Sequence, residues 1–170
     1  MNALAGRRIA KVSGTPGKTR ALNVYEMRAY YILDLPGYGY SRASRADRAA
    51  FRQLITHTVD RSRLAGVLWL LDIRREPSDA DRAIQQVFAE RETPVLAALT
   101  KSDTLARAER ARREAELRGA LELEEDQMIV TSARKNEGIE DLREAIAGLI
   151  QRPPGDPGLA PGVSLPRGPN

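Results

Sequence analysis

The hydrophobic pattern along most of the chain predicts strands and helices in alternation. Two neighbouring runs, Ala21–Glu26 and Arg28–Leu35, are rich in β-branched and aromatic residues, and they predict an antiparallel hairpin because almost nothing separates them. Two later runs, Gly66–Asp72 and Pro94–Thr100, are nearly continuous in apolar residues. Such runs are typical of strands that are buried on both faces of a sheet. A shorter run, Met128–Thr131, predicts one more strand of this kind.

Between these runs, apolar residues recur every three or four positions, which predicts amphipathic helices. Four helices are expected, over Ser44 to about Ser62, Asp79–Glu90, Ala106–Leu121 and Ile139–Ile150. Ser44 and Asp47 predict a capping box at the start of the first helix, and Ser78 predicts a cap for the second. Alternating strands and helices predict an α/β fold, a doubly wound and mostly parallel sheet with helices on both faces. In such sheets ligands bind beyond the carboxyl ends of the strands.

Composition divides the chain into a folded part and a tail. Of its 170 residues 42% are hydrophobic, enough for one domain, which we place at residues 1–150. Residues 153–170 hold six prolines and four glycines and cannot pack a core, so we expect a disordered tail over 151–170. The absence of cysteine and the single histidine exclude disulfides, thiolate metal sites and His-based zinc sites. No membrane-spanning run or leader is visible, so we expect a cytoplasmic protein.

Charge is distributed unevenly. The net charge is +4, but residues 1–50 hold nine Lys/Arg against three Asp/Glu, while residues 101–150 hold nine against twelve. A basic half of this kind is typical of a surface that contacts nucleic acid. The alternative is a set of ordinary solvated arginines, and the charge pattern by itself favours this simpler interpretation.

Three loops after expected strands carry candidate chemistry. The first holds Asp34, Leu35, Pro36 and Gly37; the second Thr100, Lys101, Ser102 and Asp103; the third Thr131, Ser132 and Ala133. A carboxylate at Asp34 can hold a water of Mg²⁺, and Gly37 lets a backbone N–H approach a terminal phosphate. Each motif alone is also an ordinary way to end a strand.

The second loop offers a way to recognise a base. The Asp103 carboxylate can accept two parallel hydrogen bonds from N1–H and the 2-amino group of guanine, a donor pair that adenine lacks. Lys101 can lay its aliphatic stem along the ring. Backbone N–H groups of the third loop can reach the carbonyl oxygen of the base. The alternative for Asp103 is a helix cap beside an exposed lysine.

Together, in this order, the three loops resemble those of the translation-factor-related GTPases, most closely the EngB (YihA/YsxC) ribosome-biogenesis GTPases. The most specific piece is Lys11-Val-Ser-Gly-Thr-Pro-Gly-Lys-Thr-Arg followed by Asp34-Leu-Pro-Gly-Tyr-Gly-Tyr, which looks like that family's two switch regions. The resemblance implies GTP and GDP as ligands, with Thr19 on Mg²⁺, Asp34 and Gly37 at the metal water and γ-phosphate, and Gly17, Lys18, Arg20 and Ala21 beside the nucleotide. Thr100, Lys101 and Asp103 would select guanine, supported by Thr131, Ser132 and Ala133.

The same resemblance implies a role in assembly of the large ribosomal subunit, with rRNA of its precursor as partner, and a need for the protein in cell division and septation. It also implies a monomer that binds neither DNA nor membrane. Tyr38 follows Gly37, where Ras-like enzymes carry a water-orienting glutamine. We therefore expect slow hydrolysis that a partner accelerates, and no catalytic residue is assigned.

One part of the family pattern is missing. The phosphate-binding sequence G-x-x-x-x-G-K-[ST] does not occur, and Met1–Arg8 resembles the helix that follows it. The first strand of this fold lies mid-sheet, and its five buried side chains would contribute roughly 7–15 kcal/mol, about the whole stability of a domain. We therefore expect a protein that begins upstream, rather than a shortened protein, and poor GTP binding by the chain as it stands.

Two alternatives from other classes remain at this point. The first is a nucleotide-free pseudo-GTPase that binds RNA or the ribosome through the basic surface. The second is a phosphorylatable receiver-type domain built on Asp72 with Thr100 and Lys101, which leaves Asp103 and the loop Thr15–Thr19 unexplained.

Overall fold

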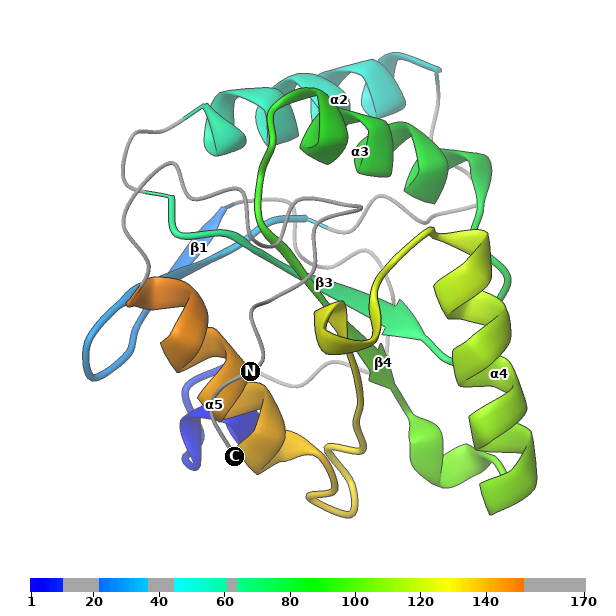
Figure 1. Ribbon diagram of the computed structural model, residues 1–170. Coiled ribbons are helices and arrows are strands. Elements are labelled where there is room, and N and C mark those ends of the chain that lie inside the picture. Colours follow the sequence, from blue (N-terminus) through cyan, green and yellow to red (C-terminus); the bar gives the residue numbers. More distant parts are fainter. Residues whose placement is uncertain (11–21, 37–44, 61–63, 152–170) are drawn as a thin grey trace.

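The computed structural model describes residues 1–10, 22–36, 45–60 and 64–151 (Figure 1). The Ser44 cap and the loop around Thr19 lie outside these residues. The predicted disordered tail also lies outside them, except for its first residue, Gln151. In chain order the elements are α1 (Asn2–Ala5), β1 (Asn23–Glu26), β2 (Tyr31–Asp34), α2 (Arg45–Val59), β3 (Val67–Asp72), α3 (Asp79–Glu90), β4 (Val95–Thr100), α4 (Arg107–Ala120), β5 (Met128–Val130) and α5 (Ile139–Ile150), with short 3₁₀ turns at Ser102–Thr104 and Glu125–Gln127.

The predicted hairpin is confirmed. Strands β1 and β2 pair antiparallel, with Val24 opposite Leu33 and Tyr25 opposite Ile32. The turn is closed by a hydrogen bond from the backbone N–H of Met27 to the carbonyl of Tyr30 at 2.9 Å. Side chains of β1 alternate between half-buried and exposed, as expected for a strand with one covered face.

The predicted parallel sheet is also confirmed, in the order β3-β4-β5. Leu70 pairs with Ala98 and Leu99 with Val130, so β4 lies in the middle. Five of its six residues are buried, which explains the continuous apolar run in the sequence. Parallel neighbours need a crossover connection, and α3 and α4 supply one for each pair.

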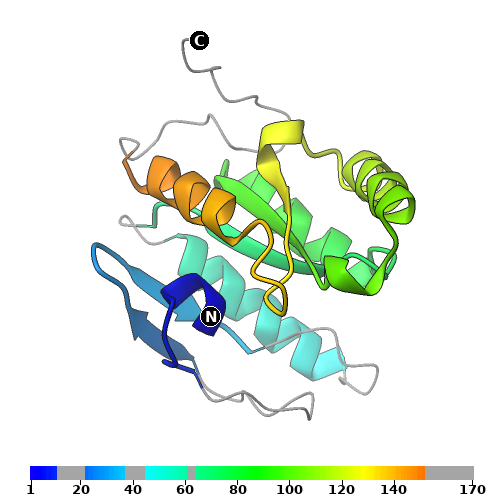
Figure 2. The same ribbon diagram turned by 90° about the horizontal axis from the view of Figure 1, so that it is seen from below.

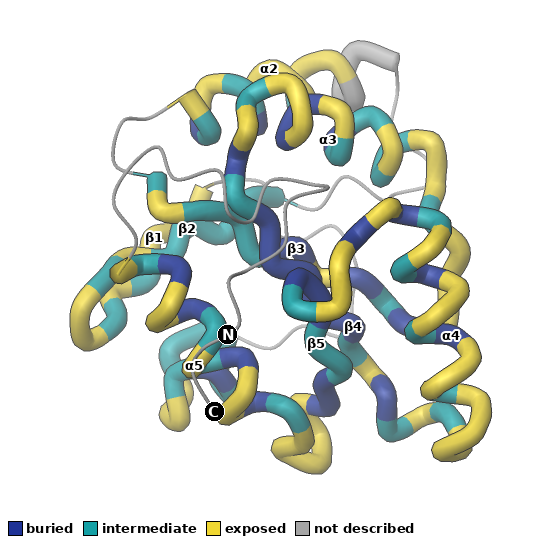
Figure 3. Tube along the Cα trace, viewed as in Figure 1, coloured by how far each residue is buried: buried dark blue, intermediate teal, exposed yellow. Residues whose placement is uncertain are grey.

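Helices cover both faces of this sheet. In Figure 1, α2 and α3 lie above the strands and α5 lies below them, with α1 beside it. Alternate residues of β4 face the two layers: Leu99 belongs to the core under α2, α3 and α4, and Ala98 to the core under α1 and α5. Trp69 of β3 meets Phe88 of α3 edge to face, with ring centroids 6.0 Å apart. Figure 3 shows this buried centre in dark blue.

The start of α3 follows the predicted capping pattern. The Ser78 hydroxyl accepts from the backbone N–H of Asp81 at 3.2 Å, and the Asp81 carboxylate accepts from the backbone N–H of Ser78 at 2.7 Å. Two N–H groups at the helix start are thereby satisfied. None of the helices in the described part of the chain combines the length and apolarity that crossing a bilayer requires.

Within the described residues the hairpin and the three-stranded sheet are separate, because β2 pairs only with β1 and β3 only with β4. Tyr31 of β2 is 67% exposed and Leu70 of β3 is 56% exposed, unusually high values for large apolar residues in strands. The expected central strand between hairpin and sheet stays a prediction.

Candidate nucleotide-binding site

The carboxyl ends of β3, β4 and β5 meet at one edge of the sheet. The backbone N–H of Ile73 donates to the carbonyl of Thr100, and that of Ser102 donates to the carbonyl of Thr131, both at 3.1 Å. These bonds continue the parallel ladders beyond the strand ends. The loops that follow the three strands are therefore direct neighbours, as the sequence predicts.

Asp103 is held in place by Ser132, a residue 29 positions later in the chain. The Ser132 hydroxyl donates to Asp103 Oδ1 at 2.7 Å and itself accepts from the backbone N–H of Lys135 at 3.1 Å. The hydrogen bond from Ser132 is the main reason why the pKa of the Asp103 carboxyl lies below its usual value, and the positive charges of Arg134 and Lys135 lower it further. Asp103 is therefore an ionised, oriented hydrogen-bond acceptor.

The second oxygen of Asp103 is less engaged. Its closest charged neighbour among the described residues is Arg134, whose NH1 lies 4.0 Å from Oδ2 with a side chain that is 86% exposed. The Asp103 side chain is only 9% exposed, so the carboxylate presents a small, defined surface. This arrangement suits recognition of a paired N–H donor edge.

The loop after β5 is built around its own backbone bonds. The N–H of Thr131 donates to Leu99 at 2.7 Å, and the N–H of Ser132 donates to Glu137 at 2.9 Å. Of the three predicted N–H groups, only that of Ala133 has no partner among the described residues. Ser132 contributes through its hydroxyl, a role that the sequence analysis did not anticipate.

Gly138 ends this loop and starts α5. It has a φ of +66°, and a Cβ at this position would lie 2.1 Å from the carbonyl oxygen of Val130. Only glycine fits such a close approach with a left-handed backbone. The loop that carries Ser132 therefore depends on a glycine six residues later.

Lys101 contacts Asp72, a residue that the sequence analysis grouped with it only in the receiver-type alternative and not in the nucleotide site. Its ammonium lies 3.0 Å from Asp72 Oδ2, at the end of the neighbouring strand. Arg74 holds the same carboxylate with two bonds, 2.8 Å to Oδ1 and 2.6 Å to Oδ2. The Arg74 guanidinium, more than Lys101, holds the pKa of the Asp72 carboxyl well below its usual range. Lys101 is thus tied to the end of β3, although its side chain is 57% exposed.

Arg113 of α4 fixes the turn that carries Arg74. Its guanidinium donates to the carbonyls of Ile73 at 3.1 Å and Arg75 at 2.9 Å. The same group pairs with Glu76 at 2.5 Å and Glu116 at 2.7 Å, and the side chain is only 10% exposed. A buried guanidinium that makes four hydrogen bonds holds the turn after β3 in place.

Two further motif residues serve the framework. The Thr100 hydroxyl donates to the carbonyl of Leu71 at 2.9 Å, which ties β4 to β3. Ser102 is 1% exposed, and its hydroxyl has no hydrogen-bond partner among the described residues.

The residues predicted on the phosphate side are only partly described. Gly17, Lys18, Thr19, Arg20, Ala21 and Gly37 lie outside the described residues. Asp34 ends β2 opposite Asn23, and its carboxylate has no partner among the described residues. The neighbouring Leu35 packs against the core under α2, α3 and α4, so this end of the hairpin is joined to the sheet by apolar contact.

The described residues do not form a protein-only metal cage, because no three His, Cys, Asp or Glu side chains cluster there. Mg²⁺ usually keeps several waters and takes one or two protein ligands together with substrate phosphates. The Asp34 carboxylate, which has no partner among the described residues, fits a metal of this kind. The described residues do not fit the receiver-type alternative, because such a domain needs several acidic side chains around a phosphate-accepting aspartate and none cluster around Asp72. Both oxygens of Asp72 are already engaged by Arg74 and Lys101.

Comparisons with known proteins agree with this geometry. The model of a family described as 50S ribosome-binding GTPase matches residues 1–101. A probable GTP-binding protein EngB from Syntrophomonas wolfei subsp. wolfei is 39% identical over 153 residues, which cover 88% of this chain and 79% of that protein. Its counterpart from Gemmatimonas aurantiaca is 37% identical over 156 residues, which cover 90% of this chain and 76% of that protein.

Solved structures show the same fold. The crystal structure of a probable GTP-binding protein EngB superposes with a TM-score of 0.70 at 19% identity, covering 88% of this chain and 89% of that chain. The FeoB G-domain from Methanococcus jannaschii gives a TM-score of 0.54 at 21% identity, covering 89% and 87%. The α/β architecture predicted from the sequence is therefore that of a P-loop GTPase. By the extent and identity of these matches, the chain belongs to the EngB family of GTP-binding proteins.

Proposed function

We propose that this protein is a GTP-dependent switch in which Asp103 reads the guanine, and that it acts in assembly of the large ribosomal subunit. The observation that carries the proposal is the ionised Asp103 carboxylate, oriented by Ser132 at the carboxyl edge of the sheet. Guanine presents N1–H and a 2-amino group side by side, and a carboxylate accepts both. Adenine presents no such pair, so Asp103 would distinguish GTP from ATP.

Lys101 would complete the base site. In the structure its ammonium lies 3.0 Å from Asp72, so the side chain connects the end of β4 to the end of β3. The guanine ring would pack with one face against the aliphatic stem of this side chain. The N–H of Ala133 is the remaining donor for the base carbonyl oxygen.

On the phosphate side, Thr19 would ligate Mg²⁺ directly and Asp34 would hold one of its waters, with Gly37 at the γ-phosphate. The ion would neutralise phosphate charge when bound. Gly17, Lys18, Arg20 and Ala21 would line the nucleotide beside it. Hydrolysis would be slow, because Tyr38 stands where Ras-like enzymes carry glutamine. Rapid single-turnover phosphate release without any partner would contradict this expectation.

The proposed partner is rRNA of the large-subunit precursor. The description of the matching family as 50S ribosome-binding supports it, and so does the excess of six positive charges, nine against three, in residues 1–50. We also propose that the protein is a cytoplasmic monomer that acts in cell division and septation and binds neither DNA nor membrane. The pseudo-GTPase alternative shares the RNA partner but predicts no nucleotide selectivity.

The test compares two proteins, the chain as printed and a version extended by the in-frame codons ahead of Met1, because the printed sequence has no G-x-x-x-x-G-K-[ST] run. GTP, GDP and ATP are titrated calorimetrically with Mg²⁺. We expect the extended version to bind guanine nucleotides at least about 100-fold more tightly than ATP, since two charge-assisted hydrogen bonds are at stake. Equal affinity for GTP and ATP would overturn the proposal, and no affinity for either would favour the pseudo-GTPase.

The base-reading residue is tested separately with Asp103→Asn in the extended version. An amide donates where the carboxylate accepts, so GTP affinity should fall at least about 10-fold while affinity for xanthosine triphosphate rises. Asp79→Asn is the matched control, because Asp79 is exposed at the start of α3. It should leave both affinities unchanged. A loss of GTP affinity that is equal in the two variants would contradict the role of Asp103.

A further inference from the structure

We propose that a pocket between α1, the turn of the β1–β2 hairpin and α5 binds the phosphodiester backbone of single-stranded RNA. The pocket has a volume of about 740 Å³ and includes Arg7, Arg28, Arg143, Glu26, Met27 and Tyr30 in its lining. We call it the arginine pocket. The inference rests on the RNA partner proposed above, and it assigns that partner a surface that shares no residue with the nucleotide site.

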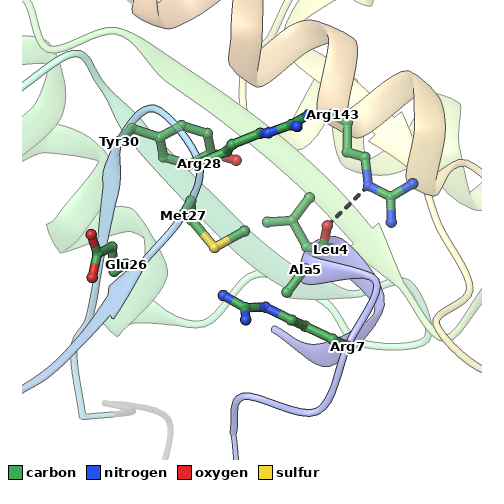
Figure 4. Close-up of a pocket in the computed structure, with 8 residues that line it drawn as sticks. All are labelled: Leu4, Ala5, Arg7, Glu26, Met27, Arg28, Tyr30 and Arg143. Atoms are coloured by element: carbon green, nitrogen blue, oxygen red, sulfur yellow. Dashed lines mark hydrogen bonds between the residues drawn. The ribbon is translucent and has the colours of Figure 1, made fainter.

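Three separate elements bring the arginines together (Figure 4). Arg7 follows α1, Arg28 lies in the hairpin turn, and Arg143 comes from α5. In Figure 4, Arg28 extends toward the side from which Arg143 enters, and Glu26 lies at the opposite side of the view. The lining holds three guanidiniums and one carboxylate, and Glu140, which pairs with Arg143 from outside the lining, leaves a local charge of +1 on Arg7 and Arg28 together with Glu26. Like charges in one concave space are costly unless an anion joins them.

Arg143 is the anchored member of the set. Its Nε donates to the carbonyl of Leu4 at 2.9 Å, its NH2 donates to the carbonyl of Ala3 at 2.8 Å, and its NH1 pairs with Glu140 at 2.6 Å. These bonds hold α1 next to α5, and Figure 2 shows the two helices near each other. Arg143 is therefore a structural residue that also contributes positive charge.

Arg7 and Arg28 are the residues available for a ligand. Both are exposed, and neither forms a hydrogen bond or ion pair with another described residue. Planar guanidiniums whose donors are not engaged by any described residue match the paired oxygens of a phosphate. Each phosphate neutralised releases condensed counterions, which makes binding to single strands salt-dependent.

The apolar part of the lining explains why the ligand is RNA rather than an acidic peptide. Tyr30 and Met27 are half-buried and pack against the core under α1 and α5, so their positions are fixed. Burial raises the pKa of the Tyr30 hydroxyl, and the nearby Arg143 only partly opposes this. A neutral ring beside guanidiniums offers stacking for a base together with contacts for its phosphate. An acidic peptide would use the charges alone.

The concave shape favours an unpaired strand. Bases in a duplex are stacked on each other and cannot turn into a pocket, whereas an unpaired base can leave its neighbours and lie against a ring. The unpaired strand also brings a phosphate with every nucleotide. The pocket therefore fits a loop, bulge or end of a structured RNA.

The experiment measures binding of the printed chain to a fluorescein-labelled RNA of about ten unpaired nucleotides by anisotropy, over a series of salt concentrations. The double variant Arg7→Ala/Arg28→Ala is compared with Arg52→Ala/Arg107→Ala, which removes two exposed arginines from α2 and α4. We expect the pocket variant to bind at least about 10-fold more weakly, with a log–log salt slope smaller by about 1.4, and the control to change less than about 2-fold. Equal losses in both variants would overturn the proposal.

The stacking surface is tested with Tyr30→Leu, which keeps apolar bulk against the core. RNA affinity should fall about 5-fold or more, because stacking of one base is lost. A hairpin duplex of the same composition and a polyglutamate peptide serve as other ligands, and both should bind more weakly than the unpaired RNA. Tighter binding of the peptide, or binding to phosphatidylglycerol vesicles that depends on the same arginines without RNA binding, would overturn the assignment to RNA.

Two controls separate this inference from the proposed function. Circular dichroism melting of every variant confirms folding, and Arg143 is left intact because it anchors α1. No nucleotide is added, so the RNA result does not depend on whether the chain binds GTP. Conversely, the extended version could fail to distinguish GTP from ATP while RNA binding is retained. That result would contradict the proposed GTP-dependent switch but not the proposed binding of RNA at the arginine pocket.

Discussion

The parallel sheet β3–β5 and the β1–β2 hairpin are stabilised in different ways, although both lead to the proposed nucleotide site. Strand β4 has a neighbour on each side and helices over both faces, and Leu99 near its carboxyl end has no exposed surface. In the hairpin, Val24 is 58% exposed and Tyr31 is 67% exposed. A two-stranded sheet is marginal without further support. The proposed base-reading end of the molecule is thus built on a well-packed sheet, whereas the proposed phosphate end is built on a lightly covered hairpin.

The largest expected effect comes from Leu99→Ala in the parallel sheet. It would leave a cavity in the core under α2, α3 and α4, so the free energy of unfolding should fall by about 2–5 kcal/mol. Val24→Ala in the hairpin should change it by less than about 0.5 kcal/mol because the side chain is exposed. Urea unfolding measures both. Similar losses in the two variants would mean that the two regions are equally well packed.

A smaller effect is expected at the loop that orients Asp103. Gly138→Ala combines an unfavourable φ with a clash against the carbonyl of Val130, and should lower stability by about 1–3 kcal/mol. Gly148→Ala in the same helix is the control, since no heavy atom lies within 4 Å of its would-be Cβ. That variant should gain up to about 1 kcal/mol from helix propensity. Equal effects in thermal melts would contradict the strict glycine requirement at the start of α5.

Asp72→Asn tests the ion pairs that join the ends of β3 and β4. Because the folded-state pKa of Asp72 is lowered, its contribution is present above the ordinary aspartate pKa and is lost as pH falls below about 4. At pH 7 the variant should lose less than about 1 kcal/mol, since the partners Arg74 and Lys101 are exposed to solvent. The difference from the unsubstituted chain should shrink in urea titrations at about pH 3. Glu144→Gln on the exposed side of α5 is the control variant at both pH values.

The smallest effect is expected from Ser102→Ala. The buried hydroxyl has no partner among the described residues, so its removal should raise the free energy of unfolding by about 0.5 kcal/mol. The same substitution at Ser132, also fully buried, removes a bond to the Asp103 carboxylate. It should cost about 1.5–3 kcal/mol. A stability loss at both serines would show that Ser102 is bonded in solution.

Much of the framework could be predicted from local patterns. The run Pro94–Thr100 indicates a buried strand, and Ser78 followed by Asp81 indicates a helix start, because both signals lie within a few residues. The motif Thr100 to Asp103 could likewise be recognised from adjacent residues. Three long-range contacts could not be predicted in this way, because they join residues 29 to 140 positions apart. They are the contacts of Ser132 with Asp103, of Lys101 with Asp72, and of Arg143 with α1.

The amino-acid sequence by itself determined the order of elements, their buried faces and the residue types at the strand ends, because hydrophobic periodicity and capping act over single turns and strands. Only the tertiary structure decided which polar groups are partners. It showed that Ser132 orients Asp103 through its hydroxyl, that Arg74 and Lys101 share Asp72, and that three distant arginines line one pocket. Such pairings depend on distance in space, which parallel crossovers and helix packing set and which no local pattern encodes.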